Sequence, residues 1–333
     1  MCIRDSDIDA QKTSSAREQF LSAKNGLLKH LVGLEPLVDR LLIALLSKGH
    51  ILIEGPPGVA KTRTIKLFSQ ALDVCFVRIQ ATPDLLPADI TGTDIYQQQS
   101  GEFSFLPGPL FNNIILVDEV NRAPPKVQSA LLEAMGEHQI STGGITRKLD
   151  EPFLVAATQN PIEHEGTYPL PEAQLDRFMF FVNIELPNVE HERQILDQVL
   201  SEQSGDEGQT FSAQTCDKNT VIAARQEVAG VFLSEAVRDY IVRIVGATRG
   251  YGAGGIHTEN ISQPASPRAS INIAIAAQAT AWLDGRDHVD PNDIASLAPD
   301  ILCGRISLDY KARAKGLTNR SIIQDIIRAT PRV

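Results

Sequence analysis

The residues with the clearest chemical meaning form a glycine-rich loop directly after the apolar segment 51–53. Glycines at two loop positions let the backbone curl so that successive N–H groups point at one anion, and the N-terminus of the next helix faces the same place. Lys61 would bring a mobile charge to the β- and γ-phosphates, and the Thr62 hydroxyl would ligate Mg²⁺. This order of strand, loop and helix is typical of the phosphate-binding loop of nucleotide triphosphatases. The loop residues are Gly55, Pro56, Pro57, Gly58, Val59, Ala60, Lys61 and Thr62.

One position departs from the general pattern of such loops, because Ala60 stands where a third glycine is usual. If the position requires a positive φ angle, alanine costs about 1–2 kcal/mol there. A chance glycine–proline turn before a helix would have no function. The agreement of strand, loop and helix argues against that alternative.

A second apolar segment, residues 114–118, ends in the carboxylates of Asp118 and Glu119. Asp118 would hold the Mg²⁺ shell, and Glu119 would polarise a water molecule toward the γ-phosphate. An acidic pair at a strand end is common by itself. The phosphate-binding loop upstream makes it a strong indication of nucleotide hydrolysis.

Two further polar residues lie at places where they could contact phosphate. Asn160 follows an apolar segment, and its carboxamide could hydrogen-bond both the γ-phosphate and the attacking water, although Asn160 and Pro161 could also form a simple turn. Arg177 ends a short predicted helix just before a buried strand. Its planar donor fork suits phosphate, and it could pair locally or project across a subunit boundary.

The apolar segments around these residues predict an α/β domain with a parallel sheet. Their nearly continuous Val, Ile, Leu and Phe content indicates strands buried on both faces, and helices separate most of them. Two hairpins interrupt this pattern, one over residues 139–149 around a Gly-Gly turn and a weaker one over 92–106. They could be surface decoration without a function. The predicted strands are residues 51–54, 75–79, 114–118, 153–158 and 178–184, and helices are expected at 34–47, 62–71 and after residue 121.

Beyond Pro187 the strand patterns stop, and helical periodicity predicts a second, smaller, all-helical domain. Residues 204–209 are expected to form a loop within it. The domain prediction is an N-terminal segment over residues 1–27, partly non-native or disordered, a core over 28–187 and a helical lid over 188–333. Helices are predicted at residues 189–200, 233–249, 267–283 and 291–303.

The composition limits the class of protein. The 333 residues carry a net charge of −10, which argues against broad binding to nucleic acid or to anionic membranes. No apolar stretch is long enough for a membrane span, and no signal peptide is evident. The four cysteines form no Cys-x-x-Cys pair, so neither a disulfide framework nor a zinc site is expected. A reducing cytoplasm is the expected location.

The order of these motifs resembles the MoxR subfamily of AAA+ ATPases. The resemblance spans residues 28–333, and its most specific motifs are Ala-Thr-Gln-Asn-Pro at 157–161 and Leu-Pro-Glu-Ala-Gln-Leu-Asp-Arg-Phe at 170–178. It implies a P-loop core with a helical lid, Walker A and Walker B motifs, and ATP and Mg²⁺ as cofactors. Ala60 is then a mark of the subfamily.

The resemblance also implies roles for individual residues. Asn160 would be sensor 1, and Arg177 would be the arginine finger that acts on the ATP of a neighbouring subunit. Arg268 would be sensor 2, closing the lid over the phosphates, and Val32 and Gly33 would lie near the adenine. The hairpins would be the helix-2 insert and the presensor-1 insert, both near a central pore.

For the whole protein, the resemblance implies a ring hexamer that remodels protein clients. A partner with a von Willebrand factor A domain and the insertion of a metal or cofactor into the client are also implied. A nucleic-acid motor or loader, which the acidic charge opposes, and a non-catalytic nucleotide-binding scaffold are the alternatives. The joint presence of Lys61, Asp118, Glu119, Asn160 and Arg177 argues against the scaffold.

Overall fold

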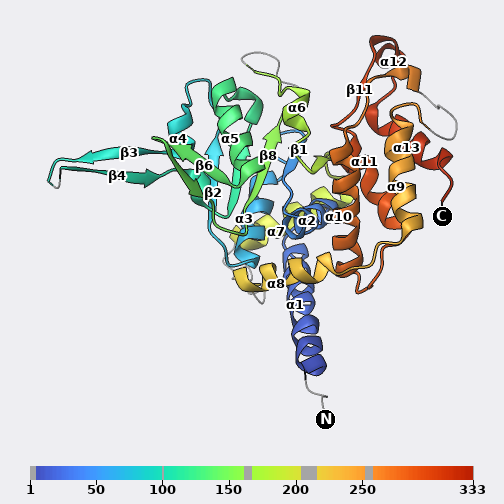
Figure 1. Cartoon of the computed structure of the whole chain (residues 1–333), viewed down its shortest axis with the longest axis horizontal. Coiled ribbons are helices and arrows are strands. Elements are labelled where there is room, and N and C mark those ends of the chain that lie inside the picture. Colours follow the sequence, from blue (N-terminus) through green and yellow to red (C-terminus); the bar gives the residue numbers. More distant parts are fainter. Residues whose placement is uncertain (1–4, 100, 161–166, 204–215, 252–257, 333) are drawn as a thin grey trace.

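A computed structural model describes residues 5–99, 101–160, 167–203, 216–251 and 258–332. At its centre lies a five-stranded sheet in the order β2-β5-β8-β1-β9, with every neighbouring pair parallel (Figure 1). The predicted α/β core with a parallel sheet is therefore confirmed. The strands are β1 (Ile51–Glu54), β2 (Phe76–Gln80), β5 (Ile114–Asp118), β8 (Leu154–Gln159) and β9 (Phe180–Asn183).

Both faces of the sheet are buried, as the continuous apolar segments predict. Alternate residues enter different clusters: Ile51 and Ile53 join a cluster that extends into the lid, whereas Leu52 packs in a second cluster with residues of α5 (Pro125–Glu137). Successive side chains of a strand point to opposite faces, so a strand buried on both sides has no polar alternation. The expectation of a doubly covered sheet is thus confirmed.

Helices pack on both faces, and α1, α2, α3 and α8 lie near one another below the sheet in Figure 1. The side chains of Phe20, Ala23 and Leu27 in α1 are fully buried in the main cluster. The residue pattern did not predict five of the helices, α1, α4, α8, α12 and α13. The helices of the chain are α1 (Asp5–Leu28), α2 (Glu35–Leu46), α3 (Lys61–Ala71), α4 (Pro87–Thr91), α5 (Pro125–Glu137), α6 (Glu172–Leu175), α7 (Val189–Gln203), α8 (Lys218–Ala229), α9 (Glu235–Ala247), α10 (Pro267–Leu283), α11 (Pro291–Leu302), α12 (Tyr310–Ala314) and α13 (Asn319–Ala329).

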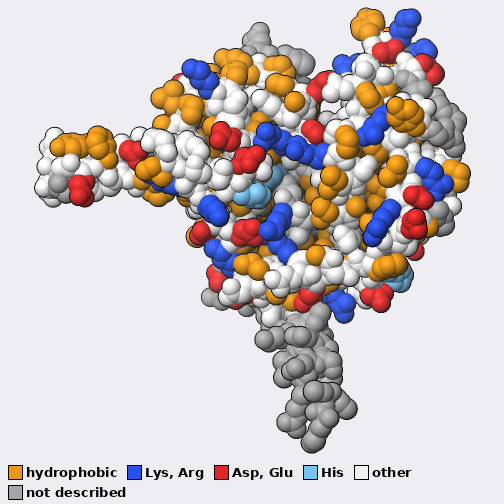
Figure 2. All heavy atoms as spheres, viewed as in Figure 1, with side chains coloured by type: hydrophobic (Ala, Val, Ile, Leu, Met, Phe, Trp, Pro, Cys, Tyr) orange, Lys and Arg blue, Asp and Glu red, His pale blue; other side chains and the backbone are white. Residues whose placement is uncertain are grey.

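Both predicted hairpins are present. Strands β6 (Gln139–Thr142) and β7 (Ile145–Lys148) pair around the Gly-Gly turn, and β3 (Gly92–Gln97) pairs with β4 (Glu102–Pro107). The β3–β4 hairpin projects from the body as a long ribbon (Figure 1). Apolar side chains are exposed along it (Figure 2), namely Ile95, Tyr96, Phe103 and Leu106.

The lid is helical apart from one detail that the sequence does not predict. Strands β10 (Ile261–Gln263) and β11 (Ser307–Leu308) form a short antiparallel sheet, so the lid is not strictly all-helical. Segments this short carry too few residues for a periodic signal. The predicted loop at residues 204–209 lies outside the described residues.

Two expectations from composition can be compared with the fold. Among the described helices, none combines the length and the apolar character that crossing a bilayer requires. The cysteines in the described residues, Cys75, Cys216 and Cys303, are all free thiols.

The backbone at Ala60 explains the unusual position in the phosphate-binding loop. Ala60 is the N-cap of α3 and has φ 56° and ψ 23°, in the left-handed region. Its carbonyl accepts the hydrogen bond from the Thr64 N–H at 3.0 Å, so it already belongs to the helix. The condition under which alanine is expected to be costly at this position, a positive φ angle, is therefore met.

Replacing Ala60 by Gly is expected to raise the free energy of unfolding by about 0.5–1 kcal/mol. Relief of roughly 1–2 kcal/mol of left-handed strain exceeds the extra backbone entropy that glycine loses on folding, about 0.5–1 kcal/mol. The control is Ala223→Gly at an exposed position of α8, which should lower stability by about 1 kcal/mol. Equal losses for both variants in urea unfolding would contradict the assignment of strain.

Candidate active site

The carboxyl ends of three strands bring the predicted catalytic residues to one edge of the sheet. The register pairs Glu54 at the end of β1 with Gln159 at the end of β8, and β8 also pairs with β5. The phosphate-binding loop follows β1, the Asp118–Glu119 pair ends β5, and Asn160 follows β8. Segments that lie up to about a hundred residues apart in the sequence therefore meet at one place.

The loop between β1 and α3 has an open surface. Gly58 has φ 85°, and a Cβ added there would meet no atom within 4 Å. The Lys61 ammonium donates to the Gly55 carbonyl at 2.7 Å. Burial lowers the pKa of Lys61, while the negative charges of Asp118 and Glu119 oppose that shift. The two acidic residues at the end of β5 thus partly offset the effect of burial on Lys61.

Asp118 is fixed by two neighbouring strands. Its side chain is 10% exposed and accepts hydrogen bonds from Arg78 Nε at 2.6 Å and from Thr158 Oγ1 at 3.1 Å. The Thr158 hydroxyl also accepts the Glu119 backbone N–H at 2.9 Å. One hydroxyl on β8 therefore aligns both acidic residues at the end of β5.

Glu119 has a strained backbone and a restrained carboxylate. Its φ of 56° lies in the left-handed region, where a non-glycine residue is uncommon and often functional. Its Oε2 accepts from Gln80 Nε2 at 3.1 Å and from Arg122 Nη1 at 3.0 Å. The carboxylate is therefore held by donors from β2 and from the turn after β5.

Sequence reasoning missed most of these supporting residues. Arg78 and Gln80 belong to no motif, because each sits inside an ordinary strand, and Thr158 lies in the Ala-Thr-Gln-Asn-Pro motif without a role that its residue type indicates. Their positions could have identified them, because all three lie near the carboxyl ends of strands in a parallel sheet. Arg122, in the turn after β5, contacts the carboxylate of Glu119, the predicted general base.

The predicted arginine finger lies against its own α5. Arg177 Nη1 donates to the Leu132 carbonyl at 2.6 Å. A Cβ added to Gly136 would lie 2.2 Å from the same nitrogen, so a larger residue at position 136 would require this guanidinium to shift. The guanidinium of Arg177 therefore contacts α5 of its own chain.

The predicted sensor 2 residue lies near the finger segment. Arg268 Nη1 is 3.8 Å from a carboxylate oxygen of Asp176, the residue directly before Arg177. The side chain of Arg268 is 52% exposed, so it can change partners at little cost. Its role as sensor 2, like that of Asn160 as sensor 1, stays a prediction.

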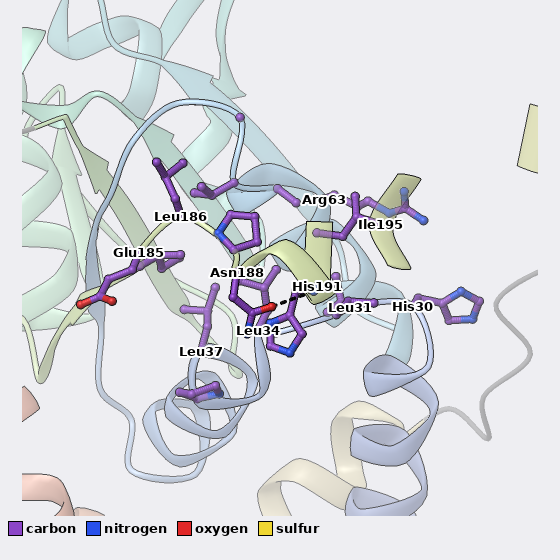
Figure 3. A pocket seen from close by; sticks show the side chains of 18 of the residues that line it. His30, Leu31, Leu34, Leu37, Arg63, Glu185, Leu186, Asn188, His191 and Ile195 are labelled. Carbon is purple, nitrogen blue, oxygen red and sulfur yellow. Dashed lines mark hydrogen bonds between the residues drawn. The ribbon is translucent and has the colours of Figure 1, made fainter. Parts of the chain in front are cut away.

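A cavity of about 440 Å³ adjoins the phosphate-binding loop at Gly58, Val59 and Ala60 (Figure 3). Val32 and Gly33, predicted to lie near the adenine, line it together with residues of α7. Its size and mainly apolar lining suit a nucleoside. The residues that the sequence did not single out include His30, Arg63, Asn188, His191 and Ile195.

The turn at Gly33 brings α7 close to the cavity. Gly33 has φ 73°, and a Cβ there would lie 2.6 Å from His191 Nδ1. The His191 N–H is capped by Asn188 Oδ1 at 2.8 Å, which begins α7 beside the cavity (Figure 3). The first turn of α7 therefore forms one wall of the pocket.

The predicted metal ligands fit Mg²⁺ by the chemistry of their donors. Thr62 offers a hydroxyl and Asp118 a carboxylate, both hard oxygen ligands. Elsewhere in the described part of the chain, no group of three or more His, Cys, Asp or Glu side chains could hold a metal ion. Mg²⁺ usually needs only one or two protein ligands, because substrate phosphates and water complete its shell.

Comparison with known proteins agrees with the site. Models of the ATPase family associated with various cellular activities (AAA) and of the AAA lid domain match residues 50–180 and 255–326. Chaperone MoxR1 of Mycobacterium tuberculosis is 45% identical over 309 residues, covering 91% of this chain and 80% of that protein. Protein MoxR of Methylorubrum extorquens is 29% identical over 319 residues, covering 90% of each. A crystal structure of a candidate ATPase from Cytophaga hutchinsonii matches with a TM-score of 0.90 and 43% identity, covering 99% of both chains. The chain therefore belongs to the AAA family of ATPases and, within it, to the MoxR group.

Proposed function

We propose that this ATPase uses Mg²⁺-dependent hydrolysis of ATP to remodel a protein client in the manner of a chaperone. The observation that carries the proposal is the meeting of the phosphate-binding loop, the Asp118–Glu119 pair and Asn160 at one sheet edge. The relative named Chaperone MoxR1 supports the chaperone-like part.

Nucleotide would bind across the loop and the adjoining cavity. Backbone N–H groups at the start of α3 would receive the phosphates, with Lys61 between the β- and γ-groups. The nucleoside would enter the cavity beside Val32 and Gly33. Thr62 and Asp118 would hold Mg²⁺, which neutralises charge on the phosphate oxygens when bound.

Hydrolysis requires a water molecule directed at the γ-phosphate. Glu119 would accept its proton, and its hydrogen bonds from Gln80 and Arg122 must rearrange before the carboxylate can turn to that water. Asn160 would fix the water and a γ-phosphate oxygen. Asp118 would exchange its contact with Arg78 for the metal shell while Thr158 keeps it aligned.

One arginine would complete the site of a neighbouring subunit. Arg177 contacts α5 of its own chain, and its charge would stabilise the transition state across a subunit boundary. Arg268, which lies beside Asp176 at the start of α10, would act as sensor 2 and close the lid over the phosphates. This arrangement supports the proposal of a ring, with six subunits as the expected number.

The β3–β4 ribbon is the proposed contact with the client. Its exposed apolar side chains and open strand edges suit an extended polypeptide (Figure 2). The net charge of −10 favours a protein client over nucleic acid. We also propose a von Willebrand factor A domain partner, metal or cofactor insertion into the client, and a cytoplasmic location.

Lys61→Ala is expected to weaken ATP binding by about 100-fold or more, because a charge-assisted contact to phosphate is lost. Titration of a fluorescent ATP analogue measures the affinity. Lys66→Ala, an exposed lysine in the same helix, is the control and should bind normally. Tight binding by the Lys61 variant would remove that residue from its assigned role.

Glu119→Gln should still bind ATP but lower turnover by about 10²–10⁴-fold, as loss of a general base does. Phosphate release under single-turnover conditions measures the chemical step. This variant should also retain a client complex in ATP, which affinity capture from cell extract can isolate. Unchanged turnover would exclude Glu119 as the base.

Arg177→Ala should bind ATP normally and hydrolyse it about 10³–10⁵-fold more slowly, as for other arginine fingers. Mixing it with Glu119→Gln subunits should restore part of the activity, because each supplies what the other lacks. Steady-state phosphate release across mixing ratios is the measurement. Absence of rescue at every ratio would show that Arg177 acts within its own subunit.

A further inference from the structure

Arg305 is buried at the joint between the lid and the arginine-finger segment. It lies between α11 and β11, and its side chain is 1% exposed. Nε donates to the Asp176 carboxylate at 2.9 Å, and the two terminal nitrogens donate to backbone carbonyls. Those carbonyls belong to Asp176, Phe178, Met179 and Ile301.

Three of these acceptors surround Arg177 in the chain. They form the turn between α6 and β9, a segment whose carbonyls have no partner strand on that side. Burying a backbone carbonyl without a hydrogen-bond donor costs free energy. In this turn the N–H groups of Arg305 supply the donors that a neighbouring strand or helix would otherwise provide. Arg305 thus determines the path of the backbone on both sides of the finger.

A second lid element reaches the same place. Ser266, the N-cap of α10, donates its hydroxyl to the Asp176 carboxylate at 2.9 Å. Arg268 follows in the first turn of α10, 3.8 Å from the same carboxylate. The Asp176 side chain therefore joins two separate parts of the lid to the residue before Arg177.

The finger is fixed at its other end as well. The guanidinium of Arg177 is held by the Leu132 carbonyl over Gly136 in α5. With its backbone restrained by Arg305 and its guanidinium hydrogen-bonded to α5, the side chain has a defined position in this structure. Such preorganisation matters because displacement by about 1 Å can lower a catalytic rate by about 100-fold.

We propose that Arg305 is a positioning residue for the reaction: through Asp176 and the neighbouring carbonyls it holds Arg177 in the position from which it reaches the nucleotide of the next subunit. This inference rests on the proposed action of Arg177 in trans. Arg305 itself touches neither nucleotide nor metal in this assignment.

The test uses mixtures in which one subunit donates the finger and the other performs the chemistry. Glu119→Gln subunits are the donors, and Arg177→Ala subunits are the acceptors. Adding Arg305→Lys to the donor should lower the recovered kcat by about 10–100-fold and leave KM for ATP unchanged, because the acceptor pocket is intact. Lysine keeps the charge but cannot bind the separate carbonyls.

The same substitution in the acceptor is the decisive control. Arg305→Lys added to Arg177→Ala subunits should leave the rescue within about twofold, because these subunits contribute no finger. A general structural defect would act in either subunit. The matched variant is Arg225→Lys in the donor, since Arg225 is also buried and donates to Leu45 and Glu151, away from the finger.

Light scattering and thermal unfolding check that each mixture assembles and folds. If Arg305→Lys subunits do not fold, the Asp176→Asn variant is used in the donor instead. Asparagine keeps the side-chain volume and the Ser266 contact but removes the negative charge that Arg305 binds. Asp176→Asn should lower the rescue by a similar factor. Full rescue by the folded donor variant, or equal loss in donor and acceptor, overturns the positioning role. No rescue with the unmodified donor would instead overturn the action of Arg177 in trans, and the inference with it.

Discussion

The constraint on which this structure depends is that all strands of its central sheet run in one direction. In a parallel sheet every carboxyl end lies at the same edge, so the loops that follow β1, β5 and β8 must meet there. The helices needed to reverse the chain cover both faces and bury the strands completely. Polar residues that follow the strands therefore lie together at the carboxyl edge of the sheet. The phosphate-binding loop and the acidic pair are both at that edge.

At that edge the acidic residues are held by other protein groups. Asp118 is paired with Arg78, and Glu119 is bound by Gln80 and Arg122. In the proposed mechanism, nucleotide binding exchanges these contacts for phosphate, Mg²⁺ and water. The left-handed backbone of Glu119 and its two donors hold its carboxylate in a defined position.

The lid is tied to the core by polar contacts as well as by apolar packing. Arg305 and Ser266 both bind Asp176, and Arg305 also lies 5.5 Å from the centre of the Phe181 ring. A buried arginine with all its donors used resists sliding, because any displacement breaks several hydrogen bonds together. The lid and the segment that carries Arg177 are therefore expected to move as one body.

The sequence by itself determined the core strands, the two hairpins, most helices and the residues that form the phosphate-binding loop and the acidic pair. These features depend on short-range causes: apolar continuity, turn chemistry and the spacing of glycine, lysine and threonine. Short elements such as β10 and β11 escaped prediction, because they exist only through pairing with a distant segment. Only the tertiary structure decided that Thr158 aligns Asp118 and Glu119, that Gly136 leaves room for Arg177, and that Arg305 closes the turn around it. Each of these contacts joins residues far apart in the chain, and no local pattern of residue types encodes which of many similar side chains will meet.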